Sequence, residues 1–247
     1  MQIRYGTGTS RGRVREQNED SFTVADCREK GFMVFAVADG MGGMDYGDLA
    51  SATAVQVLDD RCRGCDGFGN TISEVRDSFR QLFSKINIEI INKSNDKESV
   101  IGMGTTMSLC YVDMNWINIG HIGDSRIYIV RKGEIRQLTK DHSYVENLVD
   151  TGKITRAQAK NHPDKNIITK ALGLDMEVES DFCREKIESG DRILLCSDGL
   201  TNELDDSEIL NMIEGADDPA MAVDNLLEMA NKLGGRDNIT ILLVYID

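Results

Sequence analysis

The spacing of apolar residues changes along this chain in long blocks. In residues 72–95, apolar side chains recur at steps of three and four, which predicts an amphipathic helix whose stripe packs into a core. Residues 105–112, 115–123 and 126–138 instead alternate with a period of two, which predicts a β-meander. Blocks of strands interrupted by paired helices favour antiparallel sheets covered by helices over alternating βαβ units.

Shorter patterns predict the remaining elements. Lys132-Gly133 fits a tight hairpin turn, because glycine readily adopts the positive φ that such turns need. Residues 143–170 are polar and are expected to be partly helical. The chain has no tandem repeat or proline-rich linker, so residues 1–247 are expected to form one domain. Strands are expected at residues 3–9, 20–25, 32–38, 192–197 and 238–246, and helices at residues 47–62, 206–213 and 219–233.

The composition excludes several classes of function. Hydrophobic residues make up 40% of the chain and charged residues 28%, which is ordinary for a soluble globular protein. No apolar run approaches the roughly 18 residues of a membrane span, and the N-terminal segment lacks the apolar core of a signal peptide. We therefore expect a cytoplasmic monomer without membrane insertion. The net charge of −14 argues against nucleic acid as a partner.

Six cysteines are spread along the chain, and reduced, mostly buried thiols are expected for them. Cys62 and Cys65 form a C-x-x-C pair. No second pair or histidine cluster accompanies them, so we interpret the pair as a helix end rather than a zinc or redox site. A redox role for this pair, or for Cys196 two residues before Asp198, stays open as an alternative.

Aspartates stand at the ends of several predicted strands. Asp39 follows the apolar run FMVFAVA and Asp198 follows RILLCS, each with a glycine next, and Asp237 comes just before ITILLVYI. Asp124 lies between two β-prone runs. If these carboxylates converge, oxygen ligands of this kind suit Mg²⁺ or Mn²⁺ rather than zinc. Asp-Gly is also a common turn signal, so the pattern alone leaves open that each aspartate caps a turn.

A cluster of charges precedes the second predicted strand. The segment RVREQNEDSF, residues 13–22, contains Arg13, Arg15, Glu19 and Asp20. Such clusters near a terminus are usually solvated surface. The alternative is an arginine whose planar fork grips a phosphate dianion, with acidic neighbours that order metal-bound water.

Together these motifs resemble those of the metal-dependent protein phosphatase (PPM) family, type 2C, whose members are serine/threonine phosphatases. A single Asp-Gly is a weak signal, whereas seven segments in the family's order are specific and span essentially the whole chain. The resemblance is to the bacterial type. The matching segments are REQNEDSF (15–22), FAVADGMGG (35–43), GTTMS (104–108), IGDSRIY (122–128), LTKDHS (138–143), LLCSDGLTN (194–202) and GGRDNITIL (234–242).

The resemblance implies an α+β fold, a four-layer αββα sandwich of two antiparallel β-sheets flanked by helices, with a dimetal centre at one end. By that comparison Asp39 bridges two metal ions, and the Gly40 carbonyl joins Asp39 at one of them. Asp198 and Asp237 hold the other ion. Asp124, with Asp198, corresponds to the position of a third ion in bacterial relatives.

The same resemblance extends to the residues around the ions, which would be Mn²⁺ or Mg²⁺. Glu19 and Asp20 correspond to residues that contact the centre mainly through water, and Arg15 to the phosphate-binding arginine. Residues 143–170 correspond to the flap beside the active site. Met41 stands where many animal-type relatives carry the histidine proposed to protonate the leaving alkoxide, so the proton donor is not identified.

The predicted function is hydrolysis of phosphoserine and phosphothreonine in proteins by a water that two metal ions activate, in opposition to a serine/threonine kinase. Asp39, Asp198, Asp237 and Arg15 are the predicted catalytic residues. Two alternatives stay open: a metal-dependent phosphoesterase of small molecules, and a phosphoprotein-binding regulator that has lost catalysis. His142 is interpreted as a hydrogen-bonded loop histidine rather than a general acid.

Overall fold

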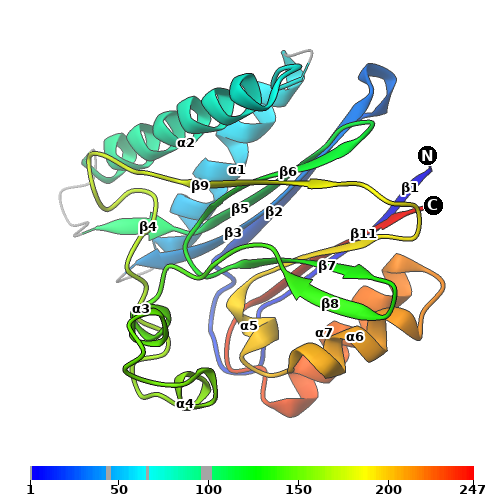
Figure 1. Ribbon diagram of the computed structural model, residues 1–247. Helices are drawn as coiled ribbons and strands as arrows, with labels where there is room; N and C mark the ends of the chain where they lie inside the picture. The colour runs from blue at the N-terminus through cyan, green and yellow to red at the C-terminus, as the bar shows by residue number, and fades with distance from the viewer. Residues whose placement is uncertain (1, 43–45, 65–66, 96–101) are drawn as a thin grey trace.

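Two antiparallel β-sheets lie face to face in the computed structural model, which describes residues 2–42, 46–64, 67–95 and 102–247 (Figure 1). One sheet has the strand order β1-β11-β10-β7-β8, and the other has the order β2-β3-β5-β6-β9, with β4 paired to β3. The strands are β1 (Ile3–Ser10), β2 (Asp20–Cys27), β3 (Phe32–Gly42), β4 (Met103–Thr105), β5 (Met107–Val112), β6 (Trp116–Ile122), β7 (Arg126–Arg131), β8 (Glu134–Gln137), β9 (Asp181–Lys186), β10 (Arg192–Cys196) and β11 (Ile239–Ile246).

Helices cover the outer face of each sheet (Figure 1). Helices α1 and α2 pack on the sheet that contains β3, and α6 and α7 pack on the sheet that contains β11. The predicted four-layer αββα sandwich is confirmed. The helices are η1 (Arg28–Lys30), α1 (Gly47–Arg63), α2 (Ile72–Asn95), α3 (Tyr144–Asp150), α4 (Arg156–Lys160), α5 (Asp198–Thr201), α6 (Asp206–Glu214) and α7 (Pro219–Leu233).

The apolar run of β3 is continuous because both of its faces are buried. Val34, Ala36 and Ala38 pack in the layer beneath α1 and α2. Met33 and Phe35 point the other way, into the layer between the sheets. Since successive side chains of a strand alternate between faces, a strand with apolar layers on both sides shows no alternation in its sequence. Burial of each large apolar side chain contributes about 1.5–3 kcal/mol.

The helices of the second layer begin at residues that satisfy free backbone N–H groups. Asp218 accepts hydrogen bonds from two N–H groups at the start of α7, where Pro219 occupies the first turn. Asp205 and Glu208 form a reciprocal capping box at the start of α6. These local signals explain why α7 begins at the residue that its sequence pattern predicts.

The predicted meander over residues 105–138 is wrong in one respect. After β6 the chain leaves its sheet, and β7 pairs with β10 in the opposite sheet. The crossing occurs at Gly123, whose φ is +102° and where an added Cβ would lie 2.5 Å from the side chain of Thr106. Period-two alternation reports which faces of a strand are buried, and it does not report which sheet the strand joins. The predicted hairpin at Lys132-Gly133 is confirmed, with positive φ at both residues.

Two further segments complete the fold. Residues 143–170 hold the short helices α3 and α4, set apart from the sandwich in Figure 1. This segment closes on itself, because Tyr144 N–H donates to the Ile167 carbonyl at 2.8 Å. Strand β9 was not predicted, since as an edge strand it buries neither face fully.

The cysteines of the described residues are free thiols, and Cys62, Cys110 and Cys196 are buried. Cys62 lies in the last turn of α1, as expected for a helix end. Cys65 lies outside the described residues, so a redox role for this pair stays a hypothesis. Within the described part of the chain, no helix is both long enough and apolar enough to span a membrane.

Candidate metal and phosphate site

Asp39 lies at the edge of the sandwich, near the end of β3. The antiparallel register places Asp20 of β2 directly opposite it. The Asp39 N–H donates to Thr106 Oγ1 at 3.0 Å, and the Asp39 carbonyl accepts from Thr106 N–H and Thr105 Oγ1, both at 2.9 Å. Hydrogen bonds on both sides of one residue fix the direction in which its carboxylate leaves the strand.

Gly40 is a glycine because the backbone of α1 lies against it. An added Cβ would meet the Gly47 carbonyl oxygen at 2.1 Å and the Glu19 carbonyl oxygen at 2.6 Å. Gly40 N–H donates to that Glu19 carbonyl at 3.1 Å, and Gly47 N–H donates to the Glu19 side chain at 3.2 Å. Close packing of Glu19, Gly40 and Gly47 therefore holds the start of α1 against the end of β3.

Asp198 is the first residue of α5 and directly follows β10 and the N-cap residue Ser197. Its Oδ2 accepts a hydrogen bond from Asn202 Nδ2 at 2.8 Å. Asn202 Oδ1 in turn accepts from Lys165 Nζ at 2.7 Å. A residue of the 143–170 segment is thereby joined to the Asp198 carboxylate through one amide.

Asp237 stands just before β11 and faces the loop between β1 and β2. Its Oδ2 accepts from Arg15 at 2.8 Å, and its Oδ1 accepts from the N–H of Asn238 at 2.8 Å. The Asn238 side chain binds the same loop, since its Nδ2 donates to the carbonyls of Arg11 and Gln17. The segment that carries Arg15 is thus fixed to the segment that carries Asp237.

Two carboxylate oxygens in this region are buried without a partner. They are Oδ1 of Asp124 and Oδ1 of Asp20, and neither has a hydrogen bond. Asp124 is 7% exposed and follows the crossing at Gly123. Its neighbour Ser125 shares a 2.6 Å hydrogen bond with Thr106, the residue that also holds Asp39. Buried polar atoms are nearly always satisfied, so these two oxygens have the chemistry of ligands for a cation or an ordered water.

Burial and neighbouring carboxylates raise the pKa values of several aspartates in this region. Desolvation raises the pKa of Asp39 well above its usual value, and the charges of Asp20, Asp198, Asp124 and Asp237 raise it further. Desolvation also raises the pKa of Asp20 to about 7, and desolvation together with Asp237 raises that of Asp198 to about 6. Five carboxylates from distant parts of the chain therefore share one electrostatic environment, and positive charge would relieve their repulsion.

Oxygen donors of this kind fit hard divalent cations. Among the described residues, no three Asp, Glu, His or Cys side chains are arranged so that they could hold one ion by themselves. Mg²⁺ in proteins typically takes one or two carboxylates and keeps several waters. The arrangement therefore fits hydrated ions between the carboxylates better than a closed protein cage.

A comparison with known families decides the identity. The family model described as protein phosphatase 2C matches residues 7–236. The chain belongs to the protein phosphatase 2C family. Serine/threonine phosphatase stp of Listeria monocytogenes is 38% identical over 239 residues, which cover 97% of this chain and 94% of stp.

Solved structures agree with this assignment. The serine/threonine phosphatase of S. agalactiae covers 100% of both chains with a TM-score of 0.93 and 35% identity. The catalytic domain of PstP in complex with two manganese ions covers 99% of both chains with a TM-score of 0.85 and 34% identity. This phosphatase 2C chain is a protein serine/threonine phosphatase of the bacterial type, as the sequence motifs predicted.

Several residues that support the phosphatase 2C site were not identified from the sequence. Thr105, Thr106, Asn202 and Asn238 all lie in the matching segments, and their roles appear only in the hydrogen bonds described above. His142 accepts from Gly123 N–H at 3.1 Å, as expected for a loop histidine. Thr105, Thr106, Asn202 and Asn238 could have been predicted from one signal, a hydroxyl or amide side chain near a predicted metal-binding aspartate in the sequence.

Proposed function

We propose that this phosphatase works with two divalent cations, Mn²⁺ or Mg²⁺. In this proposal Asp39 and the Gly40 carbonyl would hold one ion, Asp39, Asp198 and Asp237 would hold the other with water molecules between ion and protein, and Asp124 with Asp198 would form a third position. The observation that carries the proposal is the pair of unpaired buried oxygens of Asp20 and Asp124 near Asp39, whose pKa burial and four neighbouring carboxylates raise. The two manganese ions of PstP support the same number of cations. When bound, such ions neutralise phosphate charge and lower the pKa of a water molecule toward neutrality.

Glu19 and Asp20 serve this centre indirectly in the proposal. The Glu19 side chain accepts from Gly47 N–H, so it braces the start of α1. Asp20 Oδ2 accepts from Ser197 Oγ at 2.8 Å, while its Oδ1 has no partner. An oxygen of this kind is suited to accept a hydrogen bond from an ordered water between ion and protein.

Arg15 binds the phosphate in this proposal. Its side chain is 48% exposed and is held by Asp237 through one of its nitrogens. A guanidinium has five N–H donors in a planar fork, so the remaining donors are free to bind two oxygens of a phosphate dianion. The pKa of Arg15 is raised by the hydrogen bond and charge of Asp237 against the opposing effect of desolvation, so its charge is permanent.

Water, and no side chain of the protein, attacks phosphorus in this proposal. Burial raises the pKa of the Cys196 thiol to about 12, so it is not a thiolate at neutral pH. The Ser197 hydroxyl donates a hydrogen bond to Asp20 Oδ2. The thiol and hydroxyl that precede Asp198 are therefore engaged in structural roles, and no phosphoenzyme is expected.

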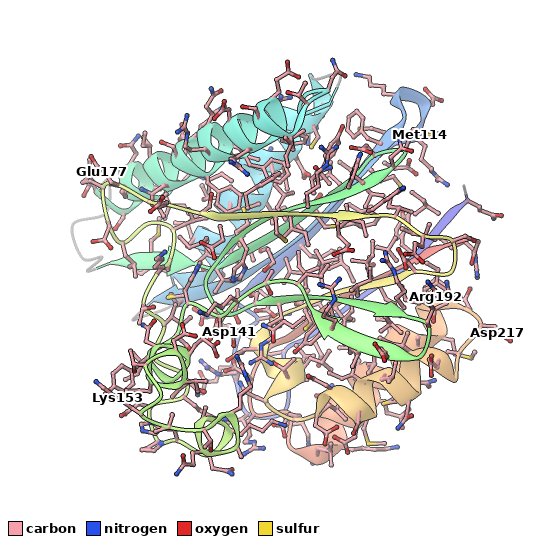
Figure 2. The ribbon with its side chains drawn as sticks, in the orientation of Figure 1. Met114, Asp141, Lys153, Glu177, Arg192 and Asp217 are labelled. Carbon is pink, nitrogen blue, oxygen red and sulfur yellow. The ribbon has the colours of Figure 1, made fainter. Side chains whose placement is uncertain are left out.

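The substrate that we propose is a segment of a phosphorylated protein. A cleft of about 1090 Å³ opens beside the carboxylates, between residues of the 143–170 flap and of α5 and α6. It is lined by Asp124 and Asp198 and by Asp141, which Figure 2 shows between α3 and α5. A cleft of this size is at the upper end of sites for small ligands and suits a longer chain.

We further propose that residues 1–247 act as one monomeric phosphatase domain in the cytoplasm. The flap, residues 143–170, would border the substrate chain. The proposed partner is a protein that carries phosphoserine or phosphothreonine. A serine/threonine kinase would add those phosphate groups. The net charge of −14 argues against nucleic acid as a partner.

The test uses Asp39→Ala and Asp237→Ala. Each should reduce Mn²⁺-dependent hydrolysis of a phosphothreonine peptide to below about 1% of the wild-type rate, because each removes a ligand of the proposed centre. Asp77→Ala, at an exposed carboxylate of α2 paired with Arg80, is the matched control. Circular dichroism checks that the variants are folded.

Three outcomes would count against parts of this proposal. Full activity of both aspartate variants would contradict the ligand set. Hydrolysis that is unaffected by EDTA would contradict the metal requirement. Faster hydrolysis of free phosphorylated metabolites than of phosphopeptides would instead favour a small-molecule phosphoesterase.

A further inference from the structure

The loop between β1 and β2 concentrates positive charge in an acidic protein. Arg11, Arg13 and Arg15 lie on this loop, whereas the whole chain has a net charge of −14. In Figure 1 the loop is the blue segment that runs beside α5 and the start of β11. Arg15 donates to Asp237 there, and the N–H of Arg13 donates to the carbonyl of Gly235, two residues before Asp237, so this part of the loop lies beside the residue proposed to bind the substrate phosphate.

One of these arginines differs from the other arginines of the chain. Arg13 is exposed, and among the residues that the structure describes its guanidinium has no hydrogen bond, ion pair or ring contact. Every other arginine has at least one. Carboxylates pair with Arg4, Arg15, Arg28, Arg63, Arg80, Arg126, Arg131, Arg136, Arg156, Arg192 and Arg236, aromatic rings lie under Arg61, Arg76 and Arg184, and Arg11 donates to the Glu16 carbonyl.

The backbone of Arg13 is nevertheless held firmly. Its N–H donates to the Gly235 carbonyl at 2.7 Å. The preceding Gly12 has a φ of +76°, and an added Cβ there would meet the Asp237 carbonyl oxygen at 2.2 Å. A Cβ at Gly235 would lie 3.0 Å from Arg13 Cγ, so the stem of the arginine passes over this glycine. A fixed backbone with a free, charged head group is suited to bind a ligand with little loss of backbone entropy.

The charges around Arg13 are already used by other partners. Arg15 is paired with Asp237, and Arg236 is held by Glu203 through its Nε and one terminal nitrogen. Among the described residues of the β1–β2 loop, Arg11 donates to a backbone carbonyl, and Arg13 is the arginine that keeps all its guanidinium donors for an anion. Val14, the next residue, is 65% exposed, so the loop also presents an apolar contact to a passing chain.

We propose that Arg13 forms a subsite for a second negative group beside the phosphorylated residue of the substrate. The group is a carboxylate or a second phosphate on the same segment of chain. This inference rests on the proposed phosphatase function and narrows it to phosphoprotein segments with acidic or phosphorylated neighbours. Rim charges act mainly on association and are screened by salt, so the preference falls as ionic strength rises.

The experiment compares three phosphothreonine peptides that differ in their flanks. The first has only neutral neighbours. The second is a series in which one glutamate is placed in turn at each flanking position. The third carries a second phosphothreonine, whose hydrolysis is measured separately. With Mn²⁺, the wild-type chain should hydrolyse the acidic and doubly phosphorylated peptides with a kcat/KM about three- to tenfold above that for the neutral peptide. The difference should come from a lower KM.

Arg13→Gln removes the charge at similar side-chain length and should reduce this ratio to near one. Arg13→Glu should reverse it, with the larger effect on the doubly phosphorylated peptide because a phosphate carries more charge than a carboxylate. Arg63→Gln is the control, since Arg63 is an exposed arginine at the far end of α1 and its loss changes the net charge equally. The control should keep the wild-type ratio at every salt concentration.

The outcomes separate this inference from the proposed function. A wild-type chain without preference, or a preference that both Arg13 variants keep, would overturn the subsite while hydrolysis of the neutral peptide continues. A wild-type chain that hydrolyses none of the three peptides would overturn the proposed function and the subsite with it. A reduced ratio in Arg63→Gln as well would mean that overall charge, rather than Arg13, sets the preference.

Discussion

Arg15 joins two segments that lie at opposite ends of the chain. It donates to Asp237 at 2.8 Å, and nearly half of its side chain stays exposed. Arg15→Ala should raise KM for a phosphopeptide roughly tenfold or more, because hydrogen bonds to charged groups contribute about 1.5–3 kcal/mol. Arg15→Lys should keep only part of the wild-type affinity for the phosphopeptide, since an ammonium cannot form the bidentate contact of a guanidinium.

Steady-state kinetics at saturating Mn²⁺ would measure both variants. The Mn²⁺ requirement is titrated separately, because loss of Arg15 also leaves Asp237 without its partner. Arg4→Ala, at an exposed arginine paired with Asp247, is the control. An unchanged KM in Arg15→Ala would contradict a phosphate-binding role.

His121 is a second residue whose environment leads to a measurable effect. Its Nδ1 is 3.0 Å from Ser108 Oγ and its Nε2 is 3.1 Å from the Lys140 carbonyl. Because a carbonyl can only accept, Nε2 carries the proton of the neutral ring. Burial, and then the neighbouring His142, lower the pKa of His121 from 6.5 to about 4.

The sign of the pH effect follows from this lowered pKa. Between pH 6.5 and about 4 the unfolded chain binds a proton at His121 that the folded chain does not. The stability is therefore complete above pH 6.5 and is lost as the pH falls. Urea unfolding should show that wild type loses roughly 2 kcal/mol more than His121→Gln between about pH 7.5 and pH 5.

The comparison with His121→Gln removes the opposite contribution of the buried carboxylates, whose raised pKa values favour the folded state at low pH. His142, whose pKa burial also lowers, is present in both proteins. Equal pH dependence in the two proteins would show that His121 does not titrate in this range.

At the scale of elements, one ion pair joins the two segments that present Asp198 and Asp237. Glu203 follows α5, its side chain is 2% exposed, and it accepts from the backbone N–H, Nε and one terminal nitrogen of Arg236. Arg236 directly precedes Asp237. This pair therefore sets the distance between two proposed metal ligands without touching an ion.

Glu203→Gln should raise the Mn²⁺ concentration for half-maximal activity about tenfold, since residues that orient metal ligands typically change affinity by ten- to a hundredfold. Calorimetric titration of Mn²⁺ would measure the same change without a substrate. Glu228→Gln, at an exposed α7 carboxylate paired with Lys232, is the control. A lowered melting temperature without any change in Mn²⁺ affinity would indicate a purely structural role.

At the scale of the whole molecule, the proposed centre opposes stability. Burial first, and then repulsion from Asp198 and Asp124, raise the pKa of Asp39, and burial with repulsion from Asp198 raises that of Asp124, at the same end of the sandwich. Removal of one of these charges should stabilise the metal-free protein. Asp39→Asn should raise the Tm in EDTA by about 2–4 °C, the change expected for about 1 kcal/mol in a chain of this size.

Mn²⁺ should raise the Tm of the wild type because it binds the folded state. It should raise the Tm of Asp39→Asn much less, since a proposed metal ligand is lost. Differential scanning calorimetry with EDTA and with Mn²⁺ measures both effects, and Asp77→Asn on α2 serves as the control. A wild-type Tm that Mn²⁺ leaves unchanged would contradict an ion site between these carboxylates.

The local sequence patterns of the chain were sufficient to predict most of its helices and strands. The bounds of α2 and α7 agree with the structure, because their apolar periodicity and caps lie within the helix itself. The aspartates at strand ends were identified for the same reason, since an apolar run and the residue that ends it are neighbours in sequence. The family motifs then supplied the four-layer fold.

Tertiary structure alone decided which of these pieces meet. The passage from β6 to the other sheet, the register that sets Asp20 against Asp39, and the contact of Lys165 with Asn202 all join residues that no local period relates. The guanidinium of Arg13 is a result of the same kind, because its lack of a partner among the described residues depends on where their carboxylates lie in the folded chain. Sequence periodicity reports burial along one element, whereas a site depends on the packing of several elements against one another.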